Sequence, residues 1–271
     1  MASAAPNPLP VLYNDLQPLS SSAHANHRLT PQEALKSVAS LHAVPLTVDE
    51  FVVAQRDYPI VFTTGPSAVP LALMGLNEGV NLFVDEEGRF RNNDNYVPAY
   101  LRRYPFMLAR LQPNSEELSL CFDPSAGIVA EGETGDALFD ADQPSDTTKA
   151  ILSFCEQFEQ SGARTGAFVD ELEKNDLLID GEVSIQPEGA EQPFIYRGFR
   201  MISEEKLRNL RGDVARKMIQ SGAMALVYAH LFSLSLIRDL FARQVALTNG
   251  GNADAGANAG DETAATGAGE G

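Results

Sequence analysis

Short apolar runs separated by turn residues fill the first half of the chain. β-prone runs cover residues 60–64, 69–75, 81–85, 106–111 and 118–122, and sequences such as Gly-Pro, Asn-Glu-Gly and Gln-Pro-Asn-Ser lie between them. Val, Ile and Phe favour strands, whereas Gly, Pro, Asn and Ser favour turns. This spacing predicts an antiparallel sheet of five or more strands.

One long helical pattern follows an acidic, glycine-rich loop at residues 123–146. Apolar side chains recur at helical spacing between Ile151 and Leu172, and Ser145 or Asp146 can serve as the N-cap. A helix with one apolar face packs that face against another element. We therefore expect this helix to cover one face of the sheet.

The C-terminal third predicts a hairpin followed by two helices. β-prone runs at residues 182–186 and 194–201 form the hairpin, and a short helix begins at Ser203. Asp213 can cap a longer helix, whose apolar residues surround much of its circumference as far as Leu240. The predicted fold class is α+β, with the sheet covered by helices and with a long buried C-terminal helix.

The composition divides the chain into three parts. Residues 1–45 have no clear period and predict an irregular arm with one short helix that starts at Thr30. Residues 46–247 contain the α+β domain. Beyond Thr248 only Gly, Ala, Asn, Asp, Glu and Thr occur, and these bury too little apolar surface to offset chain entropy. Residues 248–271 are therefore expected to be disordered.

The charge balance restricts the partners of the protein. Lys and Arg total 20 against 37 for Asp and Glu, which gives a formal net charge of -17 at pH 7. This charge repels phosphate backbones, so we expect no nucleic acid as a general partner. The N-terminus has no basic segment followed by an apolar run, which argues against a secretory signal. Cys121 and Cys155 lie among apolar neighbours, which predicts buried, reduced thiols in a cytoplasmic protein.

Residues 218–237 carry no charged side chain and are just long enough to cross a bilayer. Gln220, Ser221 and His230 interrupt the apolar run, and polar groups in hydrocarbon need partners that a lone span does not supply. Burial within the domain explains the pattern better, so we expect no integral membrane insertion. Peripheral membrane association is an alternative that requires an exposed apolar face on this helix.

The segment Tyr96–Phe106 combines four aromatic rings with two adjacent arginines. A guanidinium group binds carboxylate or phosphate through two parallel hydrogen bonds, and a tyrosine ring can stack on a ligand. The segment is therefore a candidate recognition surface. The candidate ligand-binding residues are Tyr96, Tyr100, Arg102, Arg103, Tyr104 and, from the C-terminal helix, His230.

A structural role for the same residues is the alternative. Pro98 then starts a short helix, Pro105 ends it, the aromatic rings fill the core, and the arginines pair with carboxylates. His230 lies on the apolar helix, where a core histidine with satisfied hydrogen bonds is the usual outcome. The catalytic residues, if there are any, are unknown from the sequence.

Common signatures of metal and cofactor sites are absent from the sequence. The four histidines include one close pair, His24 and His27, which lies in the irregular arm, and no metal site is predicted. The chain has no GxSxG, GxGxxG or HExxH sequence and no phosphate-binding GxxxxGK loop. The sequence therefore leaves the cofactor unknown.

A local basic stretch interrupts the acidic composition. Seven Lys and Arg residues lie between Arg197 and Lys217. This stretch can bind an acidic peptide or another subunit, or it can balance the acidic loop electrostatically. Both interpretations stay open at the level of the sequence.

Six segments of the chain together resemble the SapC family of bacterial proteins, over about residues 46–243. They include several predicted strands, the candidate recognition segment and part of the C-terminal helix. A peptide-transport permease that shares the name is unrelated. This chain has at most one borderline span, whereas a permease needs several. The segments are Tyr58–Phe62, Pro70–Gly75, Asn81–Asp85, Tyr96–Phe106, Leu138–Phe139 and Tyr228–Leu234.

The resemblance implies a context rather than a reaction. The family name comes from surface-layer (S-layer) loci, and similar members lie near genes for TonB-dependent receptors and halogenase-like proteins. The resemblance supplies no catalytic residues. We therefore expect a noncatalytic, cytoplasmic binding or accessory protein that is linked to surface-layer or outer-membrane uptake systems and has a protein partner or a small acidic ligand.

An enzyme is the alternative to a binding protein. It would act on a small acidic or peptide substrate bound near Tyr96–Phe106, with the two arginines as anion clamps and a tyrosine or His230 as the acid or base. A pocket that joins these groups would favour the enzyme. Arginines fully paired within the protein, with no cavity beside them, would exclude it in this form.

Overall fold

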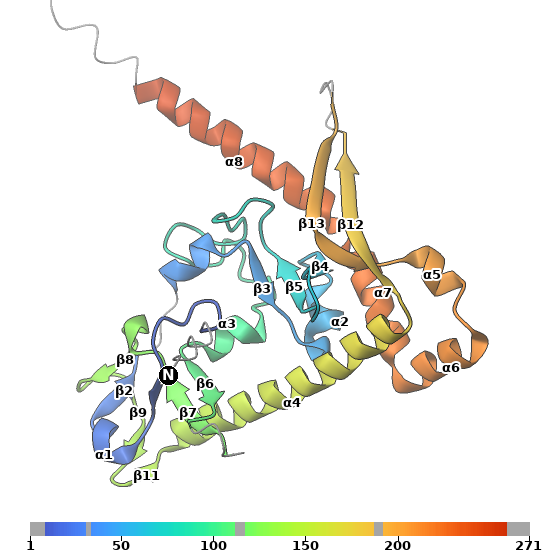
Figure 1. The fold of residues 1–271 in the computed structure, drawn as a ribbon. Helices are drawn as coiled ribbons and strands as arrows, with labels where there is room; N and C mark the ends of the chain where they lie inside the picture. Colours follow the sequence, from blue (N-terminus) through green and yellow to red (C-terminus); the bar gives the residue numbers. More distant parts are fainter. Residues whose placement is uncertain (1–8, 31–33, 112–116, 187–191, 259–271) are drawn as a thin grey trace, which may run out of the picture.

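The computed structural model describes residues 9–30, 34–111, 117–186 and 192–258 (Figure 1). Its largest sheet has five strands in the order β12-β13-β4-β5-β3, and every neighbouring pair is antiparallel. The predicted α+β class, the antiparallel sheet and the final hairpin are confirmed. The five strands are β3 (Ala43–Pro45), β4 (Ile60–Phe62), β5 (Pro70–Leu73), β12 (Leu178–Ile185) and β13 (Phe194–Ile202).

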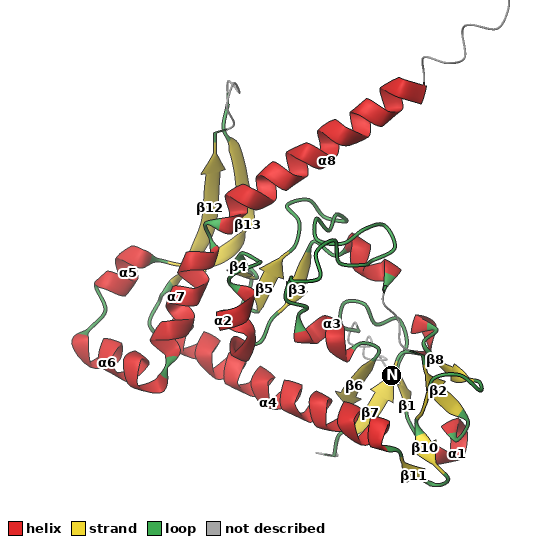
Figure 2. Cartoon of the chain, turned by 180° about the vertical axis from the view of Figure 1, so that it is seen from behind, coloured by secondary structure: helices red, strands yellow, loops and turns green. Residues whose placement is uncertain are grey.

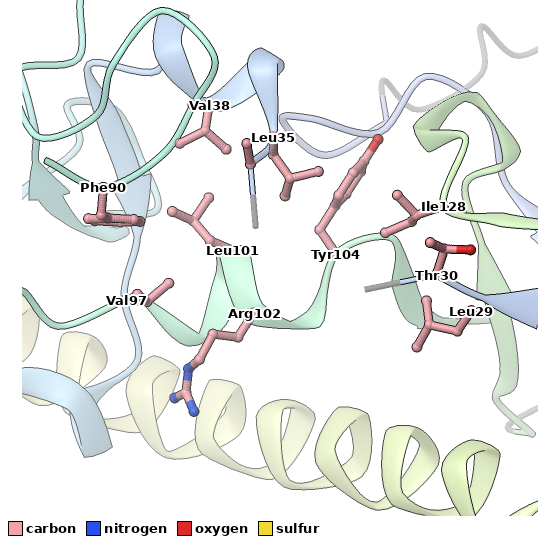
Figure 3. A pocket seen from close by; sticks show the side chains of 12 residues that line it. Leu29, Thr30, Leu35, Val38, Phe90, Val97, Leu101, Arg102, Tyr104 and Ile128 are labelled. Carbon is pink, nitrogen blue, oxygen red and sulfur yellow. The ribbon is translucent and has the colours of Figure 1, made fainter. Parts of the chain in front are cut away.

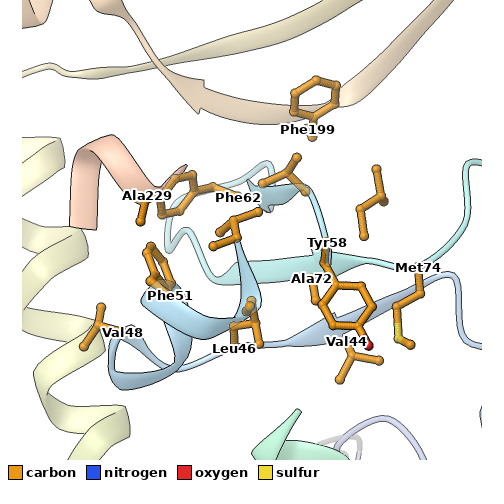
Figure 4. Close-up of a cluster of buried hydrophobic side chains, with 14 of the residues drawn as sticks. Val44, Leu46, Val48, Phe51, Tyr58, Phe62, Ala72, Met74, Phe199 and Ala229 are labelled. Atoms are coloured by element: carbon orange, nitrogen blue, oxygen red, sulfur yellow. The ribbon is translucent and has the colours of Figure 1, made fainter. Parts of the chain in front are cut away.

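Apolar side chains from this sheet and from two helices form the main hydrophobic core (Figure 4). Phe62 of β4 and Phe51 of α2 (Phe51–Ala54) are fully buried, and Ala229 of α7 (Ala223–Ser233) lies near both in Figure 4. Full burial of a phenylalanine side chain stabilises a fold by about 1.5–3 kcal/mol. The core therefore holds α2 and α7 against the sheet.

Helix α4 (Asp146–Lys174) is the longest helix, with 29 residues, and runs from the small N-terminal sheets to the region of α7 (Figure 2). The hydroxyl of Ser145 accepts a hydrogen bond from the Thr148 amide at 3.2 Å, so the predicted N-cap is confirmed. One end of α4 packs near strands β6 (Phe106–Ala109) and β11 (Gln143–Pro144), and its middle contacts the turn before α2. The helix thus joins the N-terminal sheets to the large sheet.

The single long helix predicted from Asp213 is wrong, because this region forms three helices. Gly222 ends the first with a φ of 82°, a left-handed conformation that favours glycine, and the second ends at Ser233. The last helix continues to Asn258, beyond the predicted start of disorder, and residues 259–271 lie outside the described residues. The helices are α6 (Gly212–Ser221), α7 and α8 (Leu236–Asn258), and the short helix α5 (Glu204–Arg208) precedes them as expected.

The N-terminal segment is not an irregular arm, because its short strands pair with strands about a hundred residues later. β1 (Gln17–Pro18) adds to the β6–β7 pair, and β2 (His27–Leu29) lies between β8 and β9. Strands of two or three residues show no local periodicity, so the sequence pattern did not reveal them. The remaining elements of this part are α1 (Ser21–His24), β7 (Ser119–Phe122), η3 (Pro124–Ala126), β8 (Val129–Glu131), β9 (Asp136–Ala137) and β10 (Phe139–Asp140).

Two further local predictions differ from the structure. Residues 81–85, predicted as a strand, form none, and one isolated bridge joins Val84 to Phe90. The helix predicted from Thr30 is a 3₁₀ helix, η1 (Lys36–Ser40), and part of its predicted start, residues 31–33, lies outside the described residues. A second 3₁₀ turn, η2 (Val48–Glu50), leads into α2.

Candidate functional site

The candidate segment folds around the short helix α3 (Ala99–Arg103). Pro98 precedes the helix and Tyr104 ends it, as the positions of the two prolines predicted. The helix packs against α4 and β3. Adjacent side chains on a helix point about 100° apart, so Arg102 and Arg103 take different directions.

Arg103 points into the protein and has a structural role. It is 7% exposed, and its Nη1 lies 3.4 Å from Oε1 of Glu159 on α4. Its guanidinium carbon lies 4.1 Å from the ring centre of Phe158 and 4.9 Å from that of Tyr100. These rings and the carboxylate hold the guanidinium in the interior of the protein, where its Nε is buried and has no hydrogen-bond partner among the described residues.

Arg102 points to the surface and is exposed. Its Nη2 donates a hydrogen bond to the Tyr96 hydroxyl at 3.1 Å, and its guanidinium carbon lies 5.2 Å from the ring centre of Phe154 on α4. Among the residues that the structure describes, no carboxylate pairs with it. Its remaining N–H groups can therefore bind an anion.

Glu50 supports Arg102 from inside the protein. This carboxylate is 4% exposed and accepts four hydrogen bonds, two from Thr47 and one each from the Tyr96 hydroxyl and the Ala99 amide. A buried charge is tolerated when its oxygen atoms are fully hydrogen-bonded. Because Tyr96 contacts both Glu50 and Arg102, the buried carboxylate fixes the ring beside the exposed guanidinium.

The candidate tyrosines are held as neutral phenols. Burial, followed by the nearby Glu50 carboxylate, raises the pKa of Tyr96 to about 12. Burial also raises the pKa of Tyr100 and of Tyr104. The Tyr100 hydroxyl donates to the Val11 carbonyl at 2.5 Å. These groups orient side chains and do not supply a base at neutral pH.

Two cavities adjoin the helix that carries Arg102, and both are lined by Leu29, Arg102 and Tyr104. Arg103 lines the smaller one as well. The larger has a volume of about 390 Å³ and is shown in Figure 3, and the smaller has about 290 Å³. In Figure 3 the stem of Arg102 borders the larger cavity and its guanidinium group points toward α4. The larger cavity is lined mainly by apolar side chains, namely Leu29, Ala34, Leu35, Val38, Phe90, Val97, Leu101 and Ile128.

Gly88 shapes one wall of the larger cavity. Its φ is 83°, and an added Cβ would lie 2.0 Å from the carbonyl oxygen of Leu35. No side chain fits at that distance, so only glycine allows the turn after Asp85 to pack against the segment that carries Leu35. The cavity therefore depends on a glycine far from Arg102 in the sequence.

His230 does not belong to this site. It joins two strands of the large sheet and has a structural role there. It is fully buried, its Nδ1 lies 2.8 Å from the Ile60 carbonyl oxygen, and its Nε2 accepts a hydrogen bond from the Ile202 amide at 3.0 Å. This pairing places the proton on Nδ1. Burial lowers the pKa of His230 to about 4. The geometry supports a structural role and no role as an acid or base on a ligand.

A comparison with protein families identifies the chain. A family model described as SapC matches residues 19–240. The chain belongs to the SapC family. This match begins upstream of the region that carried the sequence resemblance, in agreement with the pairing of β2 into the fold. Comparisons with curated proteins and with solved structures find no match.

The SapC-family match contains every candidate site residue, but sequence analysis missed two neighbours of Arg102. Glu50 reaches Tyr96 across 46 positions, and Phe154 lies on α4. The sequence Thr47-Val-Asp-Glu50 is a capping signal that draws attention to the carboxylate. No signal in the sequence places it beneath the candidate segment.

His24, His27 and the two cysteines of this SapC-family chain pack in the interior of the fold. The rings of His24 and His27 lie 4.8 Å apart, and His24 lies 5.1 Å from Phe122. Cys121 and Cys155 are buried and free, as predicted, and burial raises the pKa of Cys155 to about 11. Within the described residues, no group of three or more His, Cys, Asp or Glu side chains is arranged to hold a metal ion.

The basic stretch of the sequence is largely neutralised within the fold. Six of its side chains form ion pairs, and three of their partners are acidic residues at the end of α4 or just after it. This pattern favours electrostatic balance, although the partners are not in the acidic loop. The pairs are Arg197–Glu182, Arg200–Glu173, Lys206–Asp176, Arg208–Glu204, Arg211–Asp213 and Lys217–Glu171.

The apolar C-terminal region of the SapC-family fold has a buried side and an exposed side. Ala223–Leu247 is long and apolar enough to cross a membrane by length and composition, and 33% of the apolar window is buried inside the structure. Helix α7 packs against β4 and β13 on one side. On the other side, Tyr228 is 45% and Phe232 66% exposed. The absence of membrane insertion therefore stays a prediction.

Proposed function

We propose that this SapC-family chain is a noncatalytic cytoplasmic binding or accessory protein, and that it binds its ligand or partner at Arg102. One observation carries the proposal: the exposed guanidinium of Arg102 has no carboxylate partner among the described residues and adjoins two cavities. An unpaired guanidinium with apolar space beside it is a suitable recognition point for an acidic group.

The candidate acid and base groups favour binding over catalysis. Tyr96 is held as a neutral phenol, the Glu50 carboxylate is buried and already accepts four hydrogen bonds, and His230 is enclosed in the core. A general acid or base must reach the reacting atom and exchange a proton near the working pH. None of these three groups meets both conditions, which weakens the alternative of an enzyme.

The proposed cellular context rests on family membership. The SapC name derives from surface-layer loci, so we place the protein in support of a surface-layer or outer-membrane uptake system. Its net charge of -17 argues against a nucleic acid as a partner, and an acidic group is therefore expected only where a local cation such as Arg102 is exposed. A small acidic ligand and an acidic segment of a protein partner both fit this surface.

A thermal-shift screen of purified protein against small organic acids and peptides tests the proposal. A ligand that binds the folded state at one hundred times its Kd adds about 2.7 kcal/mol to stability and raises Tm. We expect a rise in Tm that is lost in Arg102→Met and kept in Arg216→Met, which removes an exposed arginine of α6. A rise that survives Arg102→Met places binding elsewhere, and conversion of a bound acid to product identifies an enzyme.

A further inference from the structure

We infer that the Arg102 site binds a carboxylate attached to an apolar chain, with the carboxylate on the guanidinium group and the chain in the cavity of about 390 Å³. This inference rests on the proposed function and names its ligand class. A medium-chain fatty acid and the apolar C-terminus of a peptide share this chemistry. Two observations support the inference: the apolar lining of the larger cavity, and the exposure of the Arg102 guanidinium beside a buried Arg103.

The cavity determines the apolar part of the ligand. Most side chains that line it are aliphatic or aromatic, and the polar residues in its lining are Thr30, Tyr104 and Arg102, whose stem borders the cavity in Figure 3. Pockets that hold small organic ligands have volumes of about 300–1,000 Å³, and this cavity lies at the low end of that range. In Figure 3 Leu35, Leu101 and Val38 surround its upper part. A short hydrocarbon chain fits these walls better than a sugar or a nucleotide.

The charge near the cavity determines the head group. Arg102 is the arginine that contributes an exposed guanidinium, whereas the neighbouring Arg103 is buried and paired with Glu159. One guanidinium carries a single positive charge, which balances one carboxylate, whereas a phosphate dianion carries about two negative charges. The two aromatic rings beside Arg102 restrict its motion, since its guanidinium carbon lies 5.6 Å from Tyr96 and 5.2 Å from Phe154. One carboxylate is therefore the head group that matches the site.

The two cavities give a matched pair of blocking variants. Ala34 lines the larger cavity, and Ala150, an exposed residue of α4, lines the smaller one. Ala34 is half-buried and Ala150 is exposed, and Ala34→Phe and Ala150→Trp add a bulky ring to the larger and to the smaller cavity respectively. We expect Ala34→Phe to block the apolar chain and Ala150→Trp to leave it bound.

Isothermal titration calorimetry with octanoate, butyrate and octanol tests the inference on the full chain. Octanoate is expected to bind about two-hundredfold more tightly than butyrate, because its four additional methylenes are buried. Arg102→Met is expected to weaken octanoate binding about tenfold, since it removes a charge-assisted hydrogen bond, while Arg216→Met leaves the affinity unchanged. Octanol, which has the chain without the charge, is expected to bind about tenfold more weakly than octanoate.

Three outcomes would overturn the inference. Equal affinity for octanoate and butyrate, both dependent on Arg102, would support the proposed binding site but show that the apolar chain does not contribute to binding. Binding of octanol as tight as that of octanoate would show that the carboxylate is not recognised. Loss of octanoate binding in Ala150→Trp but not in Ala34→Phe would place the chain in the other cavity. If no acid or peptide binds at all, the proposed function fails as well.

A trileucine peptide separates the two sources of the same chemistry. The peptide is used with a free and with an amidated C-terminus. Tighter binding of the free acid than of octanoate, lost on amidation, identifies a peptide C-terminus as the source. Tighter binding of octanoate identifies a fatty acid. Binding of the amidated peptide with unchanged affinity contradicts the inference, because the carboxylate is then not recognised.

Discussion

The hydroxyl of Tyr96 lies 3.0 Å from Oε1 of Glu50, whose carboxylate is buried beneath the surface that carries Arg102. The same hydroxyl accepts a hydrogen bond from Arg102 at 3.1 Å. A buried anion, a phenol and an exposed cation thus form one connected chain. This chain holds Arg102 in place without a direct ion pair, so the guanidinium keeps its charge available to a ligand.

Replacement of Tyr96 by phenylalanine tests this chain. We expect Tyr96→Phe to lower the free energy of unfolding by about 1–2 kcal/mol, because Glu50 loses one of its hydrogen-bond donors. The affinity for an acid bound at Arg102 should fall as well, since the guanidinium loses its anchor. Urea denaturation and calorimetry measure the two effects. Tyr228→Phe is the control, because Tyr228 is partly exposed and stacks on Phe232; equal effects of both variants would contradict the account.

The two adjacent arginines should respond differently to the same substitution. Arg103→Met removes a buried guanidinium from three aromatic rings and Glu159, and we expect a loss of about 2–3 kcal/mol in the free energy of unfolding. Arg102→Met should change stability by less than about 1 kcal/mol, because its side chain is exposed. Urea denaturation compares the two single variants. A double variant is unsuitable for binding studies, since unfolding would mimic loss of the site.

The free energy of unfolding should depend on pH because the buried His230 is neutral in the folded protein. Its pKa is about 4 in the folded protein, and the ordinary value of a histidine is about 6.5. Between these values the unfolded chain binds more protons, so the contribution of His230 is complete above pH 6.5 and is lost as the pH falls towards 4. The loss amounts to about 3 kcal/mol.

His230→Gln provides the reference for that measurement, since it keeps a donor and an acceptor but does not titrate. Urea denaturation at pH 7, 6, 5 and 4.5 gives the stability of both proteins. The advantage of the wild type should shrink steadily as the pH falls. A constant difference between the two proteins across this range would show that His230 is not the buried neutral group described above.

Alanine variants of two glycines with the same backbone conformation distinguish the cost of backbone strain from the cost of a steric clash at the cavity wall. Gly88 and Gly79 have φ values of 83° and 81°, but an added Cβ meets the Leu35 carbonyl only at Gly88. Gly79→Ala should cost about 1–2 kcal/mol through strain alone. Gly88→Ala should cost about 1–3 kcal/mol more and also weaken ligand binding, because the wall must shift. Similar stability of both variants in urea would contradict the described packing.

The sequence predicted the elements that have strong local signals. The Ser145 cap and the apolar period of α4, the hairpin before Ser203, and the helix bounded by Pro98 and Pro105 all follow from residue types close together in the chain. The N-terminal strands escaped prediction because β2 is three residues long and pairs with partners beyond residue 128. The break at Gly222 was hidden by the continuous apolar pattern around it.

The sequence identified the segment that contains the candidate site, but it did not show which of the two arginines is exposed. The pattern Arg102-Arg103 on a helix indicates that the two side chains diverge, but the core that decides which one is buried comes from α4. Glu50 is visible in the sequence only as a capping residue, because its contact with Tyr96 depends on the tertiary fold. Residues that are distant in the chain thus determine which arginine is exposed and which is buried.

The side-chain NMR signals of the two arginines test the central claim most directly. The Nε–H resonances of Arg102 and Arg103, assigned with the two single methionine variants, are followed during titration with octanoate. The account predicts a saturable shift of the Arg102 signal and an unchanged Arg103 signal, because only the first guanidinium is exposed. A shift confined to Arg103, or saturable binding that leaves the Arg102 signal unmoved, would contradict it.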